Sequence, residues 1–249
     1  MINSILKRKN QPDIAYSWEK GNENLAVVYL HGWSAQRNSI KGNTLLKIAQ
    51  KYKCHYLSLD YTAHGESGGE PSDFTVGQGI QDVWDVVQAT VQKMPVILVG
   101  NSIGGWIGLY LAQQYEQVVG FLGLAPAPDI TQYVWDKLLP DYVKSEIEKG
   151  HIFGPSPETM GFCFTQKLFQ DGEKHFLLEK EIDFNGPVRM MLGDKDDRVD
   201  IQRLYKIKDR LTSKNVSITL MKGSNHHLSE QQDLQMMQTL LSGLIQEVL

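Results

Sequence analysis

The sequence predicts an α/β protein with a mainly parallel central sheet, helices on both faces of that sheet and a small inserted lid. Short apolar runs, typical of strands buried on both faces, alternate with segments of helical periodicity through most of the chain. The clearest of these runs are 25–30 (LAVVYL) and 96–99 (VILV). Residues 126–184 interrupt the alternation and contain no clear strand–helix repeat, so we expect them to stand outside the sheet.

The first half of the chain alternates as a parallel sheet requires. Strands are predicted at 14–18, on an edge of the sheet, and at 25–30 and 54–59. Thr44 is a candidate N-cap for a helix whose apolar side chains continue to Tyr52, because its hydroxyl can accept a hydrogen bond from a free backbone N–H. Apolar residues between 76 and 91 recur at helical spacing, which predicts a second helix with one apolar face.

The second half repeats the same pattern around the insertion. Strands are predicted at 96–99, 118–125, 187–192 and 216–221. Asp200 can cap a helix over 201–211, and a C-terminal helix carries an apolar stripe from 234 to 248. Within the insertion, a helix is expected over 140–149, ending at Gly150.

We expect the 249 residues to form one domain, with a core made of 1–125 and 185–249 and a lid over 126–184. The sequence contains no internal repeat, no low-complexity tract and no linker that would mark a second domain. An insertion between two strands, above the end of the sheet that carries the candidate site, is a lid by its position.

The composition excludes several classes of function. Apolar residues make up 41% of the chain and charged residues 22%. The net charge is −4, which does not favour binding to nucleic acid or to an anionic membrane. Cys54 and Cys163 are too few for a disulfide framework. No window of about 18 apolar residues predicts a membrane span. Residues 1–9 lack an apolar targeting region and a cleavage site, so a cytoplasmic location is expected.

The segment Gly100-Asn101-Ser102-Ile103-Gly104 is the most informative in the chain. It joins a predicted strand to a predicted helix with the G-x-S-x-G spacing of a nucleophile elbow, in which a sharp turn projects the serine hydroxyl from the sheet. Its glycines are needed where a side chain would collide between the strand and the helix. A serine that only caps the helix is the alternative, and the strand–turn–helix context favours a nucleophile.

A serine nucleophile needs a base, and two neighbouring histidines compete for that role. Ser102 is inert alone, whereas a neutral imidazole can accept its proton and later return it to a leaving group. His226 and His227 both follow the predicted strand 216–221. The turn at Gly223 and Asn225 favours His226 as the residue presented over the sheet, with His227 as a surface side chain.

The base needs an acid to orient it, and several aspartates follow the strand 187–192. The candidates are Asp194, Asp196, Asp197 and Asp200. A tight turn starting at Gly193 places Asp196 over the edge of the sheet, whereas Asp200 is better explained as a helix cap. We therefore expect Asp196 to orient the imidazole and Asp194 and Asp197 to be solvated turn residues.

Backbone N–H groups are expected to stabilise the negative charge that develops on a reacting carbonyl. In proteins with this elbow, one comes from the residue after the serine and one from the loop after the first central strand, here Ile103 and Trp33. His31 and His64 are interpreted as structural. The other histidines considered, which are His55, His151 and His175, show no spacing typical of metal ligands. Neither a metal nor an organic cofactor is therefore expected.

These motifs together resemble those of the serine α/β-hydrolases across essentially the whole chain. The resemblance rests on His31-Gly32-Trp33, 60–65 with Ser67, 100–105, 193–199 and 223–228. It implies that Asp196 is the acid and His226 the histidine. The similarity extends to the branch of mitochondrial acyl-protein thioesterases and mycophenolic acid acyl-glucuronide esterases, through Gly104-Gly105-Trp106, Lys195-Asp196-Asp197 and the lid residues 173–178. The chain is expected to lack the targeting extension of that branch, so the resemblance is not taken to imply a mitochondrial location.

The expected function is that of a serine hydrolase that cleaves carboxylic esters or thioesters through an acyl-Ser102 intermediate. The partner would be a small-molecule ester or thioester, or an acylated protein. An acyltransferase or a peptidase on the same residues is one alternative, because the fold does not determine the acceptor. A non-catalytic ligand-binding protein of the same fold is another, against which the intact set of serine, acid and histidine argues.

The lid is expected to set the acyl preference, because it carries many large apolar side chains for a segment outside the sheet. They are Tyr133, Trp135, Leu138, Leu139, Phe162, Phe164 and Phe169. Some of them must pack the lid onto the body of the protein. Trp135, Phe162 and Phe164 are predicted to bind the acyl chain beside Ser102.

Overall fold

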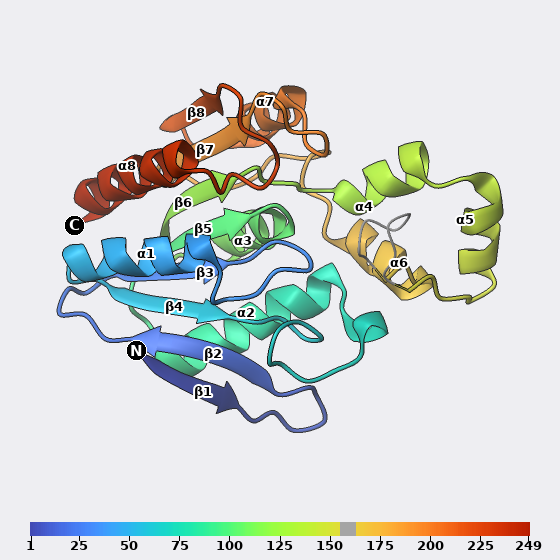
Figure 1. Cartoon of the computed structure of the whole chain (residues 1–249), viewed down its shortest axis with the longest axis horizontal. Coiled ribbons are helices and arrows are strands. Elements are labelled where there is room, and N and C mark those ends of the chain that lie inside the picture. Colours follow the sequence, from blue (N-terminus) through green and yellow to red (C-terminus); the bar gives the residue numbers. More distant parts are fainter. Residues whose placement is uncertain (155–162) are drawn as a thin grey trace.

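The computed structural model describes residues 1–154 and 163–249, and its core is an eight-stranded sheet (Figure 1). The strand order is β1-β2-β4-β3-β5-β6-β7-β8. The first two pairings, β1 with β2 and β2 with β4, are antiparallel, and all the others are parallel. The mainly parallel α/β sheet predicted from the sequence is therefore confirmed. The strands are β1 (Ile2–Leu6), β2 (Ile14–Glu19), β3 (Ala26–Leu30), β4 (His55–Leu59), β5 (Val96–Asn101), β6 (Val118–Leu124), β7 (Val188–Gly193) and β8 (Val216–Met221).

The centre of the sheet is fully enclosed. Every residue of β3 and of β5 is buried, which explains why both segments are continuous apolar runs rather than alternating ones. Burying one large aliphatic side chain contributes about 1.5–3 kcal/mol to folding, so these two strands anchor the sheet. The residues at their carboxyl ends are held on a rigid support as a result.

Helices cover both faces of the sheet, as predicted. Figure 1 shows α1 (Ile40–Lys51) and α8 (Gln231–Val248) on one face and α2 (Val76–Thr90) and α3 (Ile103–Gln114) on the other. The remaining core helix is α7 (Ile201–Arg210), whose N-cap is Asp200. The Asp200 carboxylate accepts a hydrogen bond from the Arg203 N–H at 2.9 Å, which confirms its predicted capping role.

Two expectations about the N-terminal half are wrong. The strand at residues 14–18 is not at an edge, because β1 pairs along its outer side; β1 mixes polar and apolar residues and gives no clear strand signal. Helix α1 begins at Ile40 with Ser39 as its cap, and Thr44 lies inside it. The first turn of α1 is mostly polar, so the apolar pattern that predicted the start of the helix appears one turn late.

The segment between β6 and β7 lies beyond the carboxyl ends of the strands (Figure 1). Its described part contains α4 (Ile130–Tyr133), a π-helical turn (Val134–Leu138), α5 (Asp141–Glu148) and α6 (Gln166–Lys174). These elements bury a small apolar cluster of their own, around Val134, Ile147 and Phe169. The buried carboxylate of Asp129 accepts hydrogen bonds from the N–H groups of Leu177 and Leu178, at 2.9 and 2.8 Å, and so ties the two ends of the segment together.

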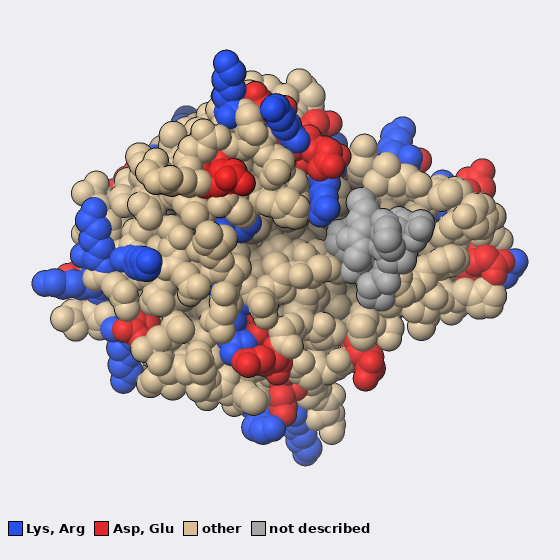
Figure 2. Space-filling model, in the orientation of Figure 1, with Lys and Arg blue, Asp and Glu red and all other residues tan. Residues whose placement is uncertain are grey.

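The surface carries both signs of charge. On the face shown in Figure 2, basic and acidic side chains are interspersed rather than gathered into one patch of one sign. None of the helices within residues 1–154 and 163–249 combines the length and the apolar character needed to cross a membrane.

Candidate active site

The predicted catalytic side chains follow three different strands at the same edge of the sheet. Ser102 comes directly after β5, and Asp196 and His226 lie in the loops that leave β7 and β8. Because β5, β6, β7 and β8 are parallel neighbours, their carboxyl ends meet, and residues far apart in sequence converge there.

Ser102 sits at the tip of a strained turn. Its φ of 53° and ψ of −116° are rarely adopted by a residue with a side chain. A Cβ on Gly100 would lie 2.4 Å from the carbonyl oxygen of Gly104, and one on Gly104 would lie 2.3 Å from that of Leu30. Only glycine fits at both positions. The Ser102 side chain makes no capping hydrogen bond to α3, so its hydroxyl remains available for another partner.

That partner is His226. The Nε2 atom of His226 lies 3.1 Å from Ser102 Oγ, and its Nδ1 lies 2.8 and 3.0 Å from the two carboxylate oxygens of Asp196. His226 is 7% exposed and the Asp196 side chain is 1% exposed. With its proton on Nδ1, the imidazole donates to the carboxylate and leaves Nε2 free to accept the serine proton.

Asp196 is held in its ionised form. Burial alone would raise the pKa of its carboxyl, but hydrogen bonds from His226 and from the N–H groups of Val199 and Arg198 outweigh burial and lower the pKa below its ordinary value. The lowered pKa matches the role of a carboxylate that stabilises a neighbouring imidazolium.

The competing aspartates and the second histidine have other contacts. Asp194 accepts a hydrogen bond from the Gly223 N–H at 2.6 Å, and Asp197 lies 4.0 Å from Arg198. The backbone N–H of His227 donates to Asn225 Oδ1 at 2.9 Å, and its ring centroid is 6.4 Å from that of His226. Among the described residues, the structure therefore brings Ser102, His226 and Asp196 together, and not their neighbours.

The loop after β3 runs beside the serine. A Cβ on Gly32 would lie 3.5 Å from Ser102 Cβ, so the chain approaches the nucleophile closely at this glycine. Trp33, the next residue, packs its ring against Phe74. Ile103 opens α3, and the first N–H groups of a helix have no partner within the helix. Trp33 and Ile103 line the same cavity as Ser102, as two oxyanion donors would.

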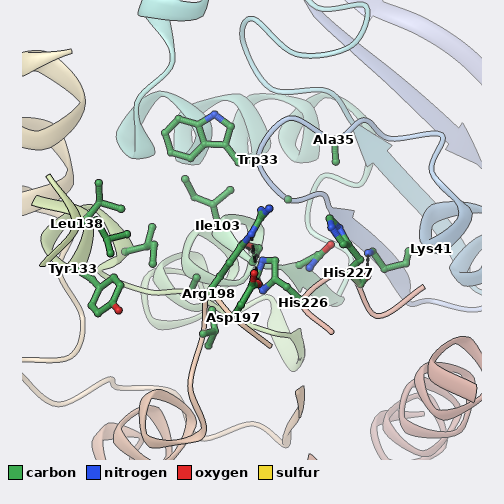
Figure 3. A pocket seen from close by; sticks show the side chains of 17 residues that line it. Trp33, Ala35, Lys41, Ile103, Tyr133, Leu138, Asp197, Arg198, His226 and His227 are labelled. Atoms are coloured by element: carbon green, nitrogen blue, oxygen red, sulfur yellow. Dashed lines mark hydrogen bonds and ion pairs between the residues drawn. The ribbon is translucent and has the colours of Figure 1, made fainter. Parts of the chain in front are cut away.

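A cavity of about 160 Å³ opens above Ser102. Figure 3 shows its two ends: Tyr133 and Leu138 of the lid lie on one side, Lys41 and His227 lie on the other, and Trp33 and Ile103 lie between them. One end is thus mostly apolar, and the other carries polar and charged groups. The lining residues are Gly32, Trp33, Ala35, Lys41, Asn101, Ser102, Ile103, Ala127, Ile130, Tyr133, Val134, Leu138, Asp197, Arg198, Val199, His226 and His227.

The lid residues predicted to bind substrate are not found at this cavity. Trp135 and Phe164 pack inside the lid, where both rings contact Phe169, with centroids 4.8 and 5.6 Å away. Phe162 lies outside the described residues. The apolar lid residues that do line the cavity include Ile130, Val134 and Leu138.

Side-chain size was a misleading criterion for the lid, and helical spacing was the better signal. Ile130, Val134 and Leu138 are four residues apart and share one side of a helical segment, whereas Trp135 points elsewhere. Lys41 and Arg198, which also line the cavity, were not predicted either. Lys41 lies in no motif, and Arg198 lies within the segment 193–199, where the aspartates rather than the arginine were considered.

Comparisons with known proteins agree with this geometry. A sequence profile of the alpha/beta hydrolase family matches residues 27–235. The mitochondrial palmitoyl-protein thioesterase ABHD10 of mouse (Mus musculus) is 31% identical, over 98% of this chain and 83% of the mouse protein. The solved structure of mouse alpha/beta hydrolase domain-containing protein 10 is similar with a TM-score of 0.88 and 30% identity, over 100% of both chains. A putative hydrolase from Agrobacterium vitis S4 has a TM-score of 0.88 and 26% identity, over 98% of each chain.

These findings confirm the resemblance seen in the sequence and correct one expectation. The predicted cytoplasmic location is wrong, because the curated mammalian relatives are named as mitochondrial proteins. The expectation rested on the composition of the first nine residues, and a short terminal stretch is a poor indicator of the compartment.

Proposed function

The chain belongs to the alpha/beta hydrolase family, and from this membership and its site we propose that it is a serine hydrolase that cleaves carboxylic esters or thioesters through an acyl-Ser102 intermediate. The observation that carries the proposal is the hydrogen-bonded series from Asp196 through His226 to Ser102, at the base of a cavity. A nucleophile, a base and an orienting acid in this order are the requirements for acyl transfer to serine.

In the proposed reaction, Ser102 Oγ attacks the carbonyl carbon of the substrate while His226 Nε2 takes the hydroxyl proton. The backbone N–H groups of Trp33 and Ile103 stabilise the oxyanion of the tetrahedral intermediate. His226 then returns the proton to the departing alcohol or thiol, which leaves the acyl group on Ser102. Water, activated by the same imidazole, hydrolyses the acyl-enzyme, and Asp196 stabilises the imidazolium in both steps.

Because one end of the cavity is mostly apolar and the other is polar, we infer that the two ends bind different parts of the substrate. The acyl chain would lie against Ile130, Val134 and Leu138, where each buried methylene contributes up to about 0.8 kcal/mol. The leaving group would face the polar end. A thioester with a medium or long acyl chain fits this arrangement, because a thiolate leaves without much help from an acid. The mouse relative is named a palmitoyl-protein thioesterase, which supports the same substrate class.

A substrate series combined with a serine-directed probe tests the proposal. The purified protein would be assayed with p-nitrophenyl esters and with acyl-CoA or acyl-cysteine thioesters of increasing chain length, and labelled with a fluorophosphonate. We expect hydrolysis of both classes, labelling at Ser102 and loss of both in Ser102→Ala with an unchanged thermal unfolding midpoint. A wild-type protein that folds but neither hydrolyses nor labels would indicate a binding protein. Faster cleavage of amides, or transfer to an added nucleophile instead of water, would favour a peptidase or an acyltransferase.

A further inference from the structure

The proposed mechanism leaves one buried cation at the cavity unused. Lys41 lies in the first turn of α1, is only 7% exposed and lines the polar end of the cavity. Lysine is almost never this deeply buried without a partner. Its partner is the backbone carbonyl oxygen of His227, the residue that follows the proposed base, and the Lys41 ammonium donates a hydrogen bond to it across 186 residues of sequence. Figure 3 shows Lys41 beside His227.

The turn that carries His226 is tied down at its start and at its end. The N–H of Gly223 donates to Asp194, and the Ser224 hydroxyl donates to the buried carboxylate of Asp233 in α8. Leu228 closes the turn with a φ of 46°, a left-handed conformation that a branched side chain rarely adopts. Between these points, the His227 carbonyl accepts from Lys41 and, at 3.0 Å, from the Ser229 hydroxyl. Lys41 is thus the contact that ties the centre of the turn to another helix.

We propose that Lys41 is a positioning residue, whose ammonium holds the His227 carbonyl and thereby fixes the turn that presents His226 to Ser102. The inference rests on the proposed function of Ser102 and His226 and adds to it a requirement for positive charge at a residue that does not touch the reacting atoms. A hydrogen bond from a charged donor is about twice as strong as a neutral one.

The surroundings of Lys41 make this contact sensitive to pH. Burial lowers the pKa of the Lys41 amine to about 8, although the carboxylate of Asp233 acts in the opposite direction. The neighbouring His227 is itself acted on by the charges of Arg198, His226, Lys41 and Asp197, all of which line the same cavity. As the pH rises through 8, the ammonium becomes a neutral amine and a weaker donor. The rate should therefore fall on the alkaline side.

The burial of Lys41 also allows a positioning role to be distinguished from a purely structural role, because the two roles predict different effects on stability when the charge is removed. A lysine whose pKa is lower in the folded than in the unfolded state binds its proton more weakly when folded, so its charge opposes folding at neutral pH. Lys41→Met keeps the length and removes the charge. It should leave the thermal unfolding midpoint unchanged or higher while activity falls.

The experiment compares the wild type with Lys41→Met, Lys41→Arg and the matched control Lys47→Met, an exposed lysine of the same helix. The readouts are kcat/KM for an acyl-cysteine thioester and the rate of fluorophosphonate labelling of Ser102, both from about pH 6 to 10, with thermal unfolding alongside. At pH 7 we expect both rates to fall roughly 10-fold or more in Lys41→Met, on the scale of a lost charged hydrogen bond. Lys41→Arg should recover most of the loss and abolish the alkaline decline, because arginine stays charged. Lys47→Met should match the wild type.

Equal rates for Lys41→Met and the wild type would overturn the proposal, and so would equal losses in the Met and Arg variants. A wild-type profile that stays flat to pH 10 would overturn it without any substitution. Failure of the proposed function looks different, because the wild type itself would then not be labelled at Ser102.

Discussion

Replacing Asp196 by asparagine should disable the base while preserving its position. Asp196 Oδ1 accepts hydrogen bonds from the N–H groups of Arg198 and Val199, both at 2.9 Å, and Oδ2 is the oxygen nearer to His226 Nδ1, at 2.8 Å. An asparagine keeps its oxygen on the two N–H groups, so its NH₂ group takes the place of Oδ2. His226 must then accept at Nδ1 and carry its proton on Nε2, where it donates toward Ser102 instead of accepting.

The expected cost is about 10⁴-fold in kcat, the scale seen when the same exchange forces the wrong tautomer in a serine protease triad, or roughly 5 kcal/mol of transition-state stabilisation. Steady-state hydrolysis of a p-nitrophenyl ester measures the loss, and thermal unfolding checks that the fold is intact.

Two neighbouring aspartates supply matched controls for this exchange. Asp194→Asn keeps an oxygen that can accept from the Gly223 N–H and loses only the charge, and Asp200→Asn replaces one good helix cap with another, so both should keep kcat within about a factor of ten. A variant Asp196→Asn that retains kcat within ten-fold of the wild type, or a greater sensitivity at Asp194, would refute the tautomer argument.

Three further predictions follow from other parts of the structure. His226→Ala should lose activity on the scale of Asp196→Asn and His227→Ala only mildly, because only His226 lies within hydrogen-bond distance of Ser102 Oγ; equal losses in the two variants would contradict the assigned base. Leu138→Ala should lower octanoyl relative to acetyl turnover roughly 3- to 10-fold, because Leu138 lines the cavity, whereas Trp135→Ala should mainly lower the unfolding midpoint; the reverse ranking would return the acyl site to Trp135. Asp129→Ala should lower the free energy of unfolding by about 2–5 kcal/mol in urea, since it leaves the N–H groups of Leu177 and Leu178 buried without their acceptor; a loss below about 1 kcal/mol would show that water replaces it.

Local signals in the sequence were sufficient for the fold and for the candidate triad. A strand buried on both faces must be apolar along its length, so β3 and β5 can be recognised in the sequence as continuous apolar runs. The elbow requires glycine at 100 and 104 for steric reasons that hold whatever the rest of the chain does. Asp196 and His226 follow strands of one parallel sheet, so their convergence on Ser102 follows from the topology.

Only the tertiary structure decided which side chains line the cavity and which support it. Leu138 is 47% exposed and lies at the cavity, whereas Phe164 is larger but buried in the lid's own cluster, because the rotation of the lid segment determines which side meets the body. Lys41 reaches the His227 carbonyl through the packing of α1 beside the final turn, a contact without any pattern in the sequence. Periodicity reports which residues share a face of one element, but contacts between elements depend on how those elements are placed, and that placement is set by the packing of the whole core.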